Sequence, residues 1–135
     1  MATNLIPYLH FRDTARDAME LYRSILGGDL EIRTFGDFNQ GEGGADLVMH
    51  ASLETPAGYT IFASDSAPGN ERAEGENVAL CLAGDDAEEL RDHFRRLSEE
   101  GTVRMPLERQ MWGDEFGMLV DRFGIHWMVN IGPSS

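Results

Sequence analysis

Residues 5–28, with the sequence LIPYLHFRDTARDAMELYRSILGG, join a short apolar run to one amphipathic helix. The run at 5–11 is rich in strand-forming residues. Asp13 or Thr14 can cap the start of the helix, and the two glycines at 27–28 can end it in the left-handed conformation. Helical spacing places one apolar face on Ala15, Ala18, Met19, Tyr22, Ile25 and Leu26. The stretch therefore predicts a strand followed at once by a helix that packs through one face.

The same pattern occurs a second time along the chain. The apolar run NVALCLA at 77–83 precedes a helix in which Asp86 and Glu89 have capping-box spacing. The apolar face of this second helix consists of Ala87, Leu90, Phe94 and Leu97. Strand-like segments follow each helix, at 30–35, 47–54 and 59–65 in the first half and at 102–108, 116–121 and 125–131 in the second. The chain thus has the pattern β-α-β-β-β twice.

This duplication predicts an α+β fold of two tandem β-α-β-β-β modules with mixed, mostly antiparallel sheets and cup-like cavities. We place module one at 1–65, a linker at 66–76 and module two at 77–135, all within a single domain. The glycine-rich stretches 36–46 and 66–76 are expected to be loops. One module is too small to bury a good core alone. The sheets are therefore expected to pack face to face, to curl around a shared cavity or to be completed by a second chain.

Composition excludes several classes of partner. The chain has 135 residues, and 24 acidic against 11 basic side chains give a net charge of -13. Such a charge repels phosphate backbones and anionic lipids, so we expect no nucleic-acid and no membrane partner. The single cysteine, Cys81, permits neither an internal disulfide nor a multi-thiolate zinc site, and its apolar context predicts a buried thiol. Together with the lack of a signal peptide, this predicts a cytoplasmic protein.

Several short segments resemble one branch of a known superfamily. They are Pro7-Tyr8-Leu9 with Phe11, Ala18-Met19-Glu20-Leu21-Tyr22, Met49-His50-Ala51, Ala63-Ser64-Asp65, Met105-Pro106-Leu107, and Trp112-Gly113-Asp114-x-Phe116-Gly117 followed by Asp121-x-Phe123-Gly124. The chain resembles the PhnB-like branch of the vicinal oxygen chelate superfamily, which includes glyoxalase I, the bleomycin- and fosfomycin-resistance proteins and the extradiol dioxygenases. The branch is often labelled 3-demethylubiquinone 3-methyltransferase-like, but the sequence contains no glycine-rich S-adenosylmethionine loop. The resemblance also implies a homodimer.

The metal enzymes of this superfamily hold a divalent cation with His and Glu ligands from four strands. The resemblance places the four ligand positions in this sequence strand by strand. They fall at Pro7 or Tyr8 on the first strand, at His50, at Asn77 or Val78 on the strand that opens the second half, and at about Met128 on the last strand. Proline, valine and methionine are not ligands of a hard divalent ion. The resemblance therefore implies a protein without the family metal and without another cofactor. A metal triad of His10, His50 and His126 is the alternative.

Strand periodicity selects the candidate ligand-binding residues. Tyr8 and His10 share one face of their strand, and they can orient a polar substrate or satisfy each other. His126 shares a face with Met128, opposite Trp127. His50 and Phe62 belong to two further strands.

The segment from Trp112 to Phe116 precedes another strand. It is expected either to be a lid, in which Asp114 orients a ligand stacked on the aromatic rings, or to cover the open end of the core with Trp112. The predicted ligand-binding set is Tyr8, His10, His50, Phe62, Trp112, Asp114, Phe116 and His126.

Two functions from different classes are compatible with these residues. The first is a glyoxalase/bleomycin-resistance-like protein that binds a small molecule in its cavity without a metal. The second is a lyase, isomerase or dioxygenase-type enzyme that uses a divalent metal or a His/Tyr acid–base pair on a small oxygenated substrate. A structural or interaction module is a third possibility, and no catalytic residue is assigned.

Overall fold

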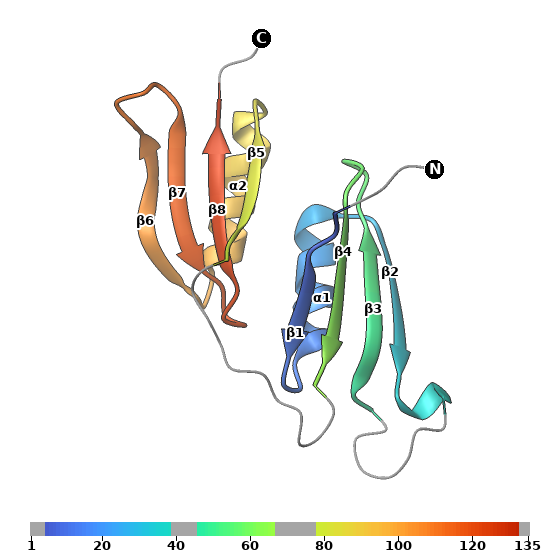
Figure 1. Cartoon of the computed structure of the whole chain (residues 1–135). Coiled ribbons are helices and arrows are strands. Elements are labelled where there is room, and N and C mark those ends of the chain that lie inside the picture. The colour runs from blue at the N-terminus through green and yellow to red at the C-terminus, as the bar shows by residue number, and fades with distance from the viewer. Residues whose placement is uncertain (1–4, 39–45, 67–77, 133–135) are drawn as a thin grey trace. The chain divides into compact units, whose positions relative to one another are not determined.

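The computed structural model describes residues 5–38, 46–66 and 78–132, and the chain divides into two compact units, 1–74 and 75–135 (Figure 1). Each unit contains one α-helix and one four-stranded sheet, which confirms the predicted α+β fold of two β-α-β-β-β modules. The predicted loops at 36–46 and 66–76 fall largely outside the described residues. Among the described residues, no helix is long and apolar enough to cross a membrane.

Unit one contains five main elements. They are β1 (Tyr8–Phe11), α1 (Ala15–Leu26), β2 (Asp29–Thr34), β3 (Val48–Glu54) and β4 (Thr60–Asp65), with a short 3-10 helix at Gly36–Phe38. The sheet order is β1-β4-β3-β2, with β1 parallel to β4 and the other neighbours antiparallel. The strand β1 is shorter than the predicted run because Pro7, which has no backbone N–H, precedes it.

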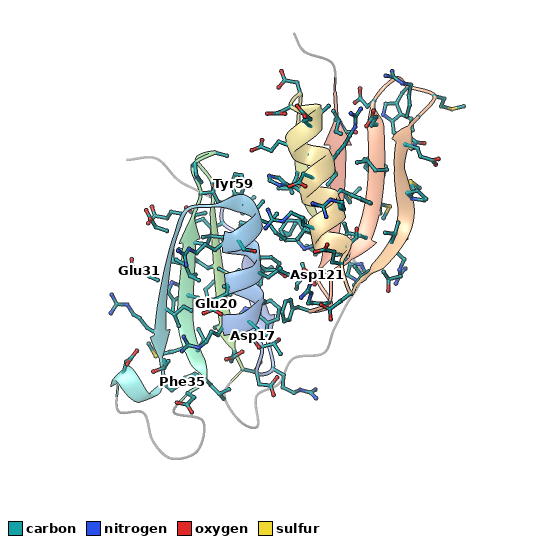
Figure 2. All side chains as sticks on the ribbon, turned by 180° about the vertical axis from the view of Figure 1, so that it is seen from behind. Asp17, Glu20, Glu31, Phe35, Tyr59 and Asp121 are labelled. Atoms are coloured by element: carbon teal, nitrogen blue, oxygen red, sulfur yellow. The ribbon has the colours of Figure 1, made fainter. Side chains whose placement is uncertain are left out.

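The helix α1 covers one face of this sheet. Its predicted apolar face is confirmed, because all six residues are buried, among them Met19 and Tyr22 with no exposed surface. Ile61 and Leu53 project from the strands toward the helix and are buried as well. Asp17 and Glu20 lie on the exposed side of the helix (Figure 2). We call the sheet face that the helix does not cover the open face.

Asp65 organises the start of α1, a role we did not predict. Its carboxylate is buried and accepts hydrogen bonds from the Ala15 amide at 2.9 Å and from the Val48 amide at 2.8 Å. Thr14 occupies the N-cap position but makes no side-chain cap bond, and Asp65 instead accepts from the first helical amide. A residue at the end of β4 thus joins the helix, β3 and β4.

A close approach of backbones requires the glycine at the end of this helix. Gly28 has a φ of 109°, and a Cβ added there would overlap the backbone carbonyl of Glu54. Only glycine can adopt that conformation with a carbonyl so near. The contact lets β2 begin directly beside the end of β3.

Unit two repeats the arrangement. Its elements are β5 (Leu80–Gly84), α2 (Ala87–Ser98), β6 (Thr102–Arg109), β7 (Glu115–Val120) and β8 (His126–Ile131). The sheet order is β5-β8-β7-β6, again with one parallel pair, between the first and last strands. Asp86 caps this helix as its spacing predicts, because its carboxylate accepts from the Glu89 amide at 3.1 Å, which is one of the two bonds of a capping box.

The core of unit two lies between α2 and its sheet. Trp127 is 1% exposed, and its indole Nε1–H donates to Asp121 at 2.9 Å. The same carboxylate accepts from the amides of Phe123 and Ile125, which fixes the turn before β8. His126 and Met128 lie on the open face of the sheet, so the predicted alternation with Trp127 is confirmed.

The prediction of a buried Cys81 is wrong. Its side chain is exposed on the open face, opposite the face that packs on α2. Cys81 pairs with Met128, whereas Leu80 pairs with the buried Trp127. An apolar run does not by itself show which of its alternating side chains face the core.

Candidate functional site

Four of the predicted site residues gather on the open face of unit one. Tyr8 and His10 come from β1, His50 from β3 and Phe62 from β4. The parallel register of β1 and β4 pairs Tyr8 with Phe62 and His10 with Ser64. Directly paired residues point to the same side of a sheet, so these side chains meet on one face. We call Tyr8, His10, His50 and Phe62 the aromatic cluster.

The aromatic cluster is held by ring contacts and hydrogen bonds. The Tyr8 and His10 rings stack with their centroids 4.9 Å apart and an angle of 10° between their planes. The Tyr8 hydroxyl and His50 Nδ1 lie 3.2 Å apart, and Phe62 meets the His50 ring edge-on at 4.8 Å. Either member of the Tyr8–His50 bond is the donor, depending on the His50 tautomer. The predicted sharing of a face by Tyr8 and His10 is confirmed.

Two further polar residues border the aromatic cluster and were missed in the sequence. The Ser64 hydroxyl lies 3.3 Å from His10 Nδ1, and Ser64 itself is 8% exposed. Arg33 pairs in register with His50 and lies 3.9 Å from the Glu31 carboxylate. Ser64 lies two residues after Phe62 on the same strand, so strand alternation alone could have placed both side chains on one face. Arg33 became identifiable only through the pairing of β2 with β3.

This arrangement has a defined chemical capacity. The Tyr8 side chain is 44% exposed and His10 is exposed, while His50 and Phe62 are partly buried. Flat rings provide stacking surface, and imidazole and phenol groups provide hydrogen bonds that fix orientation. The face can therefore accept a planar molecule with polar oxygen atoms.

The other four predicted residues belong to unit two. Phe116 and His126 lie on the open face of its sheet, where Phe116 pairs with Asn130 and His126 pairs with Val120. The Asp114 carboxylate accepts from the Asn130 side chain at 3.1 Å. Asp114 thus joins the β6–β7 connection to β8.

Trp112 occupies the hairpin between β6 and β7. Its side chain is 61% exposed, and its ring meets that of Phe116 edge-on at 6.2 Å. The interpretation of Trp112 as a plug of the core is therefore wrong, because a plug would be buried. Gly113 beside it has a φ of 105°, as a tight hairpin requires.

An ion pair fixes the start of β7 against α2. Arg91 donates two hydrogen bonds to the Glu115 carboxylate, one of them from Nε at 3.0 Å. The hydrogen bond from Arg91 lowers the pKa of Glu115 below its ordinary value, and the charge of Arg91 adds to this effect. The bidentate geometry holds the strand that follows the Trp112 hairpin.

The described residues do not fit the divalent metal of the superfamily. Of the carried-over positions, Pro7, Val78 and Met128 offer no hard donor, and Asn77 lies outside the described residues. In the described ranges, no group of three or more His, Cys, Asp and Glu side chains gathers to hold an ion. His50 is hydrogen-bonded to the Tyr8 hydroxyl rather than grouped with carboxylates.

One hollow lies away from these residues. It measures about 440 Å³ and is lined by Glu20, Arg23, Ser24 and the glycines at 27–28, at the end of α1. It contains none of the eight predicted residues. Its lining offers no aromatic surface, so the aromatic cluster remains the stronger candidate.

Comparison with known proteins places the chain among relatives of similar length. The family model for 3-demethylubiquinone-9 3-methyltransferase matches residues 3–130. The crystal structure of protein PA1353 from Pseudomonas aeruginosa is 35% identical, with a TM-score of 0.90 over 98% of this chain and 100% of that one. The PhnB protein from Bacillus cereus, described as a putative 3-demethylubiquinone-9 3-methyltransferase, is 25% identical, with a TM-score of 0.77 over 96% and 100%.

A more distant structure shares the fold. A glyoxylase/bleomycin resistance protein/dioxygenase domain from Frankia sp. EAN1pec is 16% identical, with a TM-score of 0.70 over 100% of this chain and 95% of that one. The fold of two tandem modules is therefore common to both groups.

Proposed function

The chain belongs to the 3-demethylubiquinone-9 3-methyltransferase family, and from this we propose that it binds a small oxygenated molecule without a divalent metal. The family has the glyoxalase/bleomycin-resistance/dioxygenase fold of the vicinal oxygen chelate superfamily. The observation that supports the proposal most is the aromatic cluster on the open face of unit one. We assign no methyl transfer to the chain, because its sequence contains no glycine-rich S-adenosylmethionine loop.

The chemistry of the face favours a planar ligand with polar oxygens. Tyr8 and Phe62 supply apolar ring surface, and His10, His50 and Arg33 supply hydrogen-bond donors. Donors around a stacking surface select for carbonyl, carboxylate or phenolate oxygens on the ligand. A net charge of -13 disfavours polyanionic ligands.

We propose that residues of unit two contact a ligand on their own sheet. Trp112 presents an exposed indole beside Phe116, which suits a mobile aromatic lid over a ligand. His126 and Phe116 supply one polar and one apolar group on the open face of the second sheet. Asp114 positions the hairpin through Asn130.

A cytoplasmic homodimer is the state in which we propose that the chain acts. The edge strand β6 supports this, because Val103 and Met105 are 45% and 39% exposed. Apolar residues on an edge strand are commonly covered by a partner. Sedimentation of a 15.0 kDa species at micromolar concentration would contradict the dimer.

A screen by thermal shift against a metabolite and antibiotic library tests the binding function. A compound that raises the melting temperature is then titrated against wild type, Tyr8→Phe and His50→Gln. Tyr8→Phe removes the phenol hydroxyl and His50→Gln removes the imidazole ring, so we expect each to weaken binding about tenfold. Tyr59→Phe is the matched control, because Tyr59 is also partly exposed but lies in the turn before β4. If no compound shifts the protein, an interaction module is favoured.

Metal content tests the second part of the proposal. Tag-free protein is dialysed and its divalent metals are measured by plasma emission. Stoichiometric zinc, nickel, manganese or iron that resists dialysis would overturn the metal-free proposal.

The Tyr8–His50 contact supports one alternative, an enzyme with a His/Tyr acid–base pair. With the two groups 3.2 Å apart, the imidazole can take up a proton while the phenol holds its orientation. Tyr8→Phe keeps the ring but removes the hydroxyl. An enzyme of this kind should lose about 10²–10⁴-fold in turnover of the bound compound, while its affinity changes far less.

A further inference from the structure

Sulfur-bearing side chains form a row across the sheet of unit two. Cys81 on β5 pairs with Met128 on β8, and Met128 pairs with Met118 on β7. Met118 in turn pairs with Met105 on the edge strand β6, at a β-bulge. The row includes the single cysteine of the chain and three of its seven methionines. We call Cys81, Met118 and Met128 the sulfur row, with Met105 at its outer end.

The sulfur row lies on the open face and outside the core. Paired residues point to the same side of a sheet, and Cys81 is exposed while Met118 and Met128 are partly buried. Their chain neighbours Leu119 and Trp127 are each 1% exposed and face α2. Core filling, the usual role of methionine, therefore does not account for these side chains.

The spacing of the sulfur row allows its side chains to converge. Directly opposed residues on neighbouring strands have Cβ atoms about 4.5–5.5 Å apart. Methionine has three rotatable bonds and a polarisable sulfur. The side chains of Met118 and Met128 can therefore adopt rotamers that bring their sulfur atoms toward the Cys81 thiol. Met128 lies between Cys81 and Met118 in the sheet and is the centre of such a group.

Donor chemistry defines the class of ion. Sulfur donors favour soft ions, and two thioethers beside one thiolate favour Cu(I) over Zn(II), whereas hard divalent ions prefer oxygen donors. Among the described residues, no cluster of three His, Cys, Asp and Glu side chains offers such a hard site. We propose that Cys81, Met118 and Met128 bind one soft monovalent cation, Cu(I) or its analogue Ag(I). This site uses no residue of the aromatic cluster, although Met118 and Met128 share the open face of unit two with Phe116 and His126.

Silver nitrate in a chloride-free buffer is the first probe. The full-length reduced protein, labelled with ¹³C at the methionine methyl groups, is titrated and followed by NMR. The site predicts one ion per chain and shifts of the Met118 and Met128 methyl signals. Met111, which is 98% exposed in the hairpin beyond β6, should not shift. Equal shifts of all exposed methionines, or none at Met118 and Met128, would overturn the site.

Matched variants separate the cluster from an isolated thiol. Met118→Leu/Met128→Leu keeps the volume of both side chains and leaves Cys81 intact, and it should bind Ag(I) about tenfold more weakly or worse. Cys81→Ser should weaken binding at least as much, and Met111→Leu should leave it unchanged. Binding by the double variant as tight as by wild type would reduce the site to a lone thiol and refute it. If the double variant does not fold, each single leucine variant gives the same comparison.

Two further ions test the selectivity. Cu(I), supplied anaerobically and measured by competition with a coloured Cu(I) chelator, should show the same ranking of variants as Ag(I). Zn(II) should produce no shift of the Met118 and Met128 methyl signals. The same shifts with Zn(II) would overturn the assignment to soft ions.

Discussion

Replacing Asp65 by alanine should destabilise unit one strongly, because two buried amides lose their acceptor. Asp65 is 5% exposed and accepts from the amides of Ala15 and Val48. A hydrogen bond to a charged group contributes about 1.5–3 kcal/mol, so losing both should lower the free energy of unfolding by about 3–6 kcal/mol. Asp65→Asn keeps one oxygen acceptor and should lose about half of that. The loss is large against a typical total of about 5–15 kcal/mol.

Unfolding in urea, followed by far-ultraviolet circular dichroism, measures the effect. Tryptophan fluorescence is unsuitable, because Trp112 and Trp127, the two tryptophans of the chain, both belong to unit two. Asp17→Ala is the matched control, since Asp17 lies exposed on the first turn of α1 (Figure 2). A loss for Asp65→Ala no larger than for Asp17→Ala would refute the reasoning that this carboxylate joins the helix to the sheet.

Other substitutions test other parts of the structure. Trp112→Ala should change the melting temperature little, because Trp112 is 61% exposed, whereas Trp127→Ala should cost about 3–5 kcal/mol of stability; equal losses in thermal melts would contradict the lid. If Trp112 is a lid, Trp112→Ala should also weaken ligand binding by about 10- to 100-fold in a titration. The hydrogen bond from Arg91 lowers the folded-state pKa of Glu115, so the ion pair stabilises the fold at pH values above the ordinary pKa of an unfolded glutamate, and this stability is lost as the pH falls through the folded pKa. Melts of Glu115→Gln should therefore lie below wild type at pH 7 and converge with it in acid; a constant difference would argue against the pair. Gly28→Ala should lower the melting temperature more than Gly58→Ala, where a Cβ meets nothing within 4 Å, although both glycines have positive φ.

The elements of the fold were predictable because their signals are local. Helical spacing from Ala15 to Leu26, and the capping pair of Asp86 and Glu89, depend on residues within a few turns. The link from Asp65 to Ala15 joins residues 50 positions apart, and no local pattern indicates it. The start of α1 is therefore capped by Asp65, which is distant in the sequence, and not by the neighbouring Thr14.

The candidate site was predictable in part for the same reason. Alternation along one strand placed Tyr8 beside His10 and His126 beside Met128. The contact of Tyr8 with His50 depends on the order and register of the strands in the sheet. No local sequence pattern predicts either of these. The exposure of Cys81 was missed because either face of a short apolar strand can point to the core.

The parallel pairing of first and last strands has a consequence for the order of folding. Tyr8 of β1 pairs with Phe62 of β4, while β3 and β4 are joined by a tight turn in which the Gly58 amide donates to the Thr55 carbonyl. Closing a long loop is slower than closing a short one, so the β3–β4 hairpin should be protected from hydrogen exchange before β1 attaches. Until then, β4 presents an unpaired edge along which another chain can add a strand. The aromatic cluster, which needs β1 for two of its four rings, should therefore assemble only after the β3–β4 hairpin has formed.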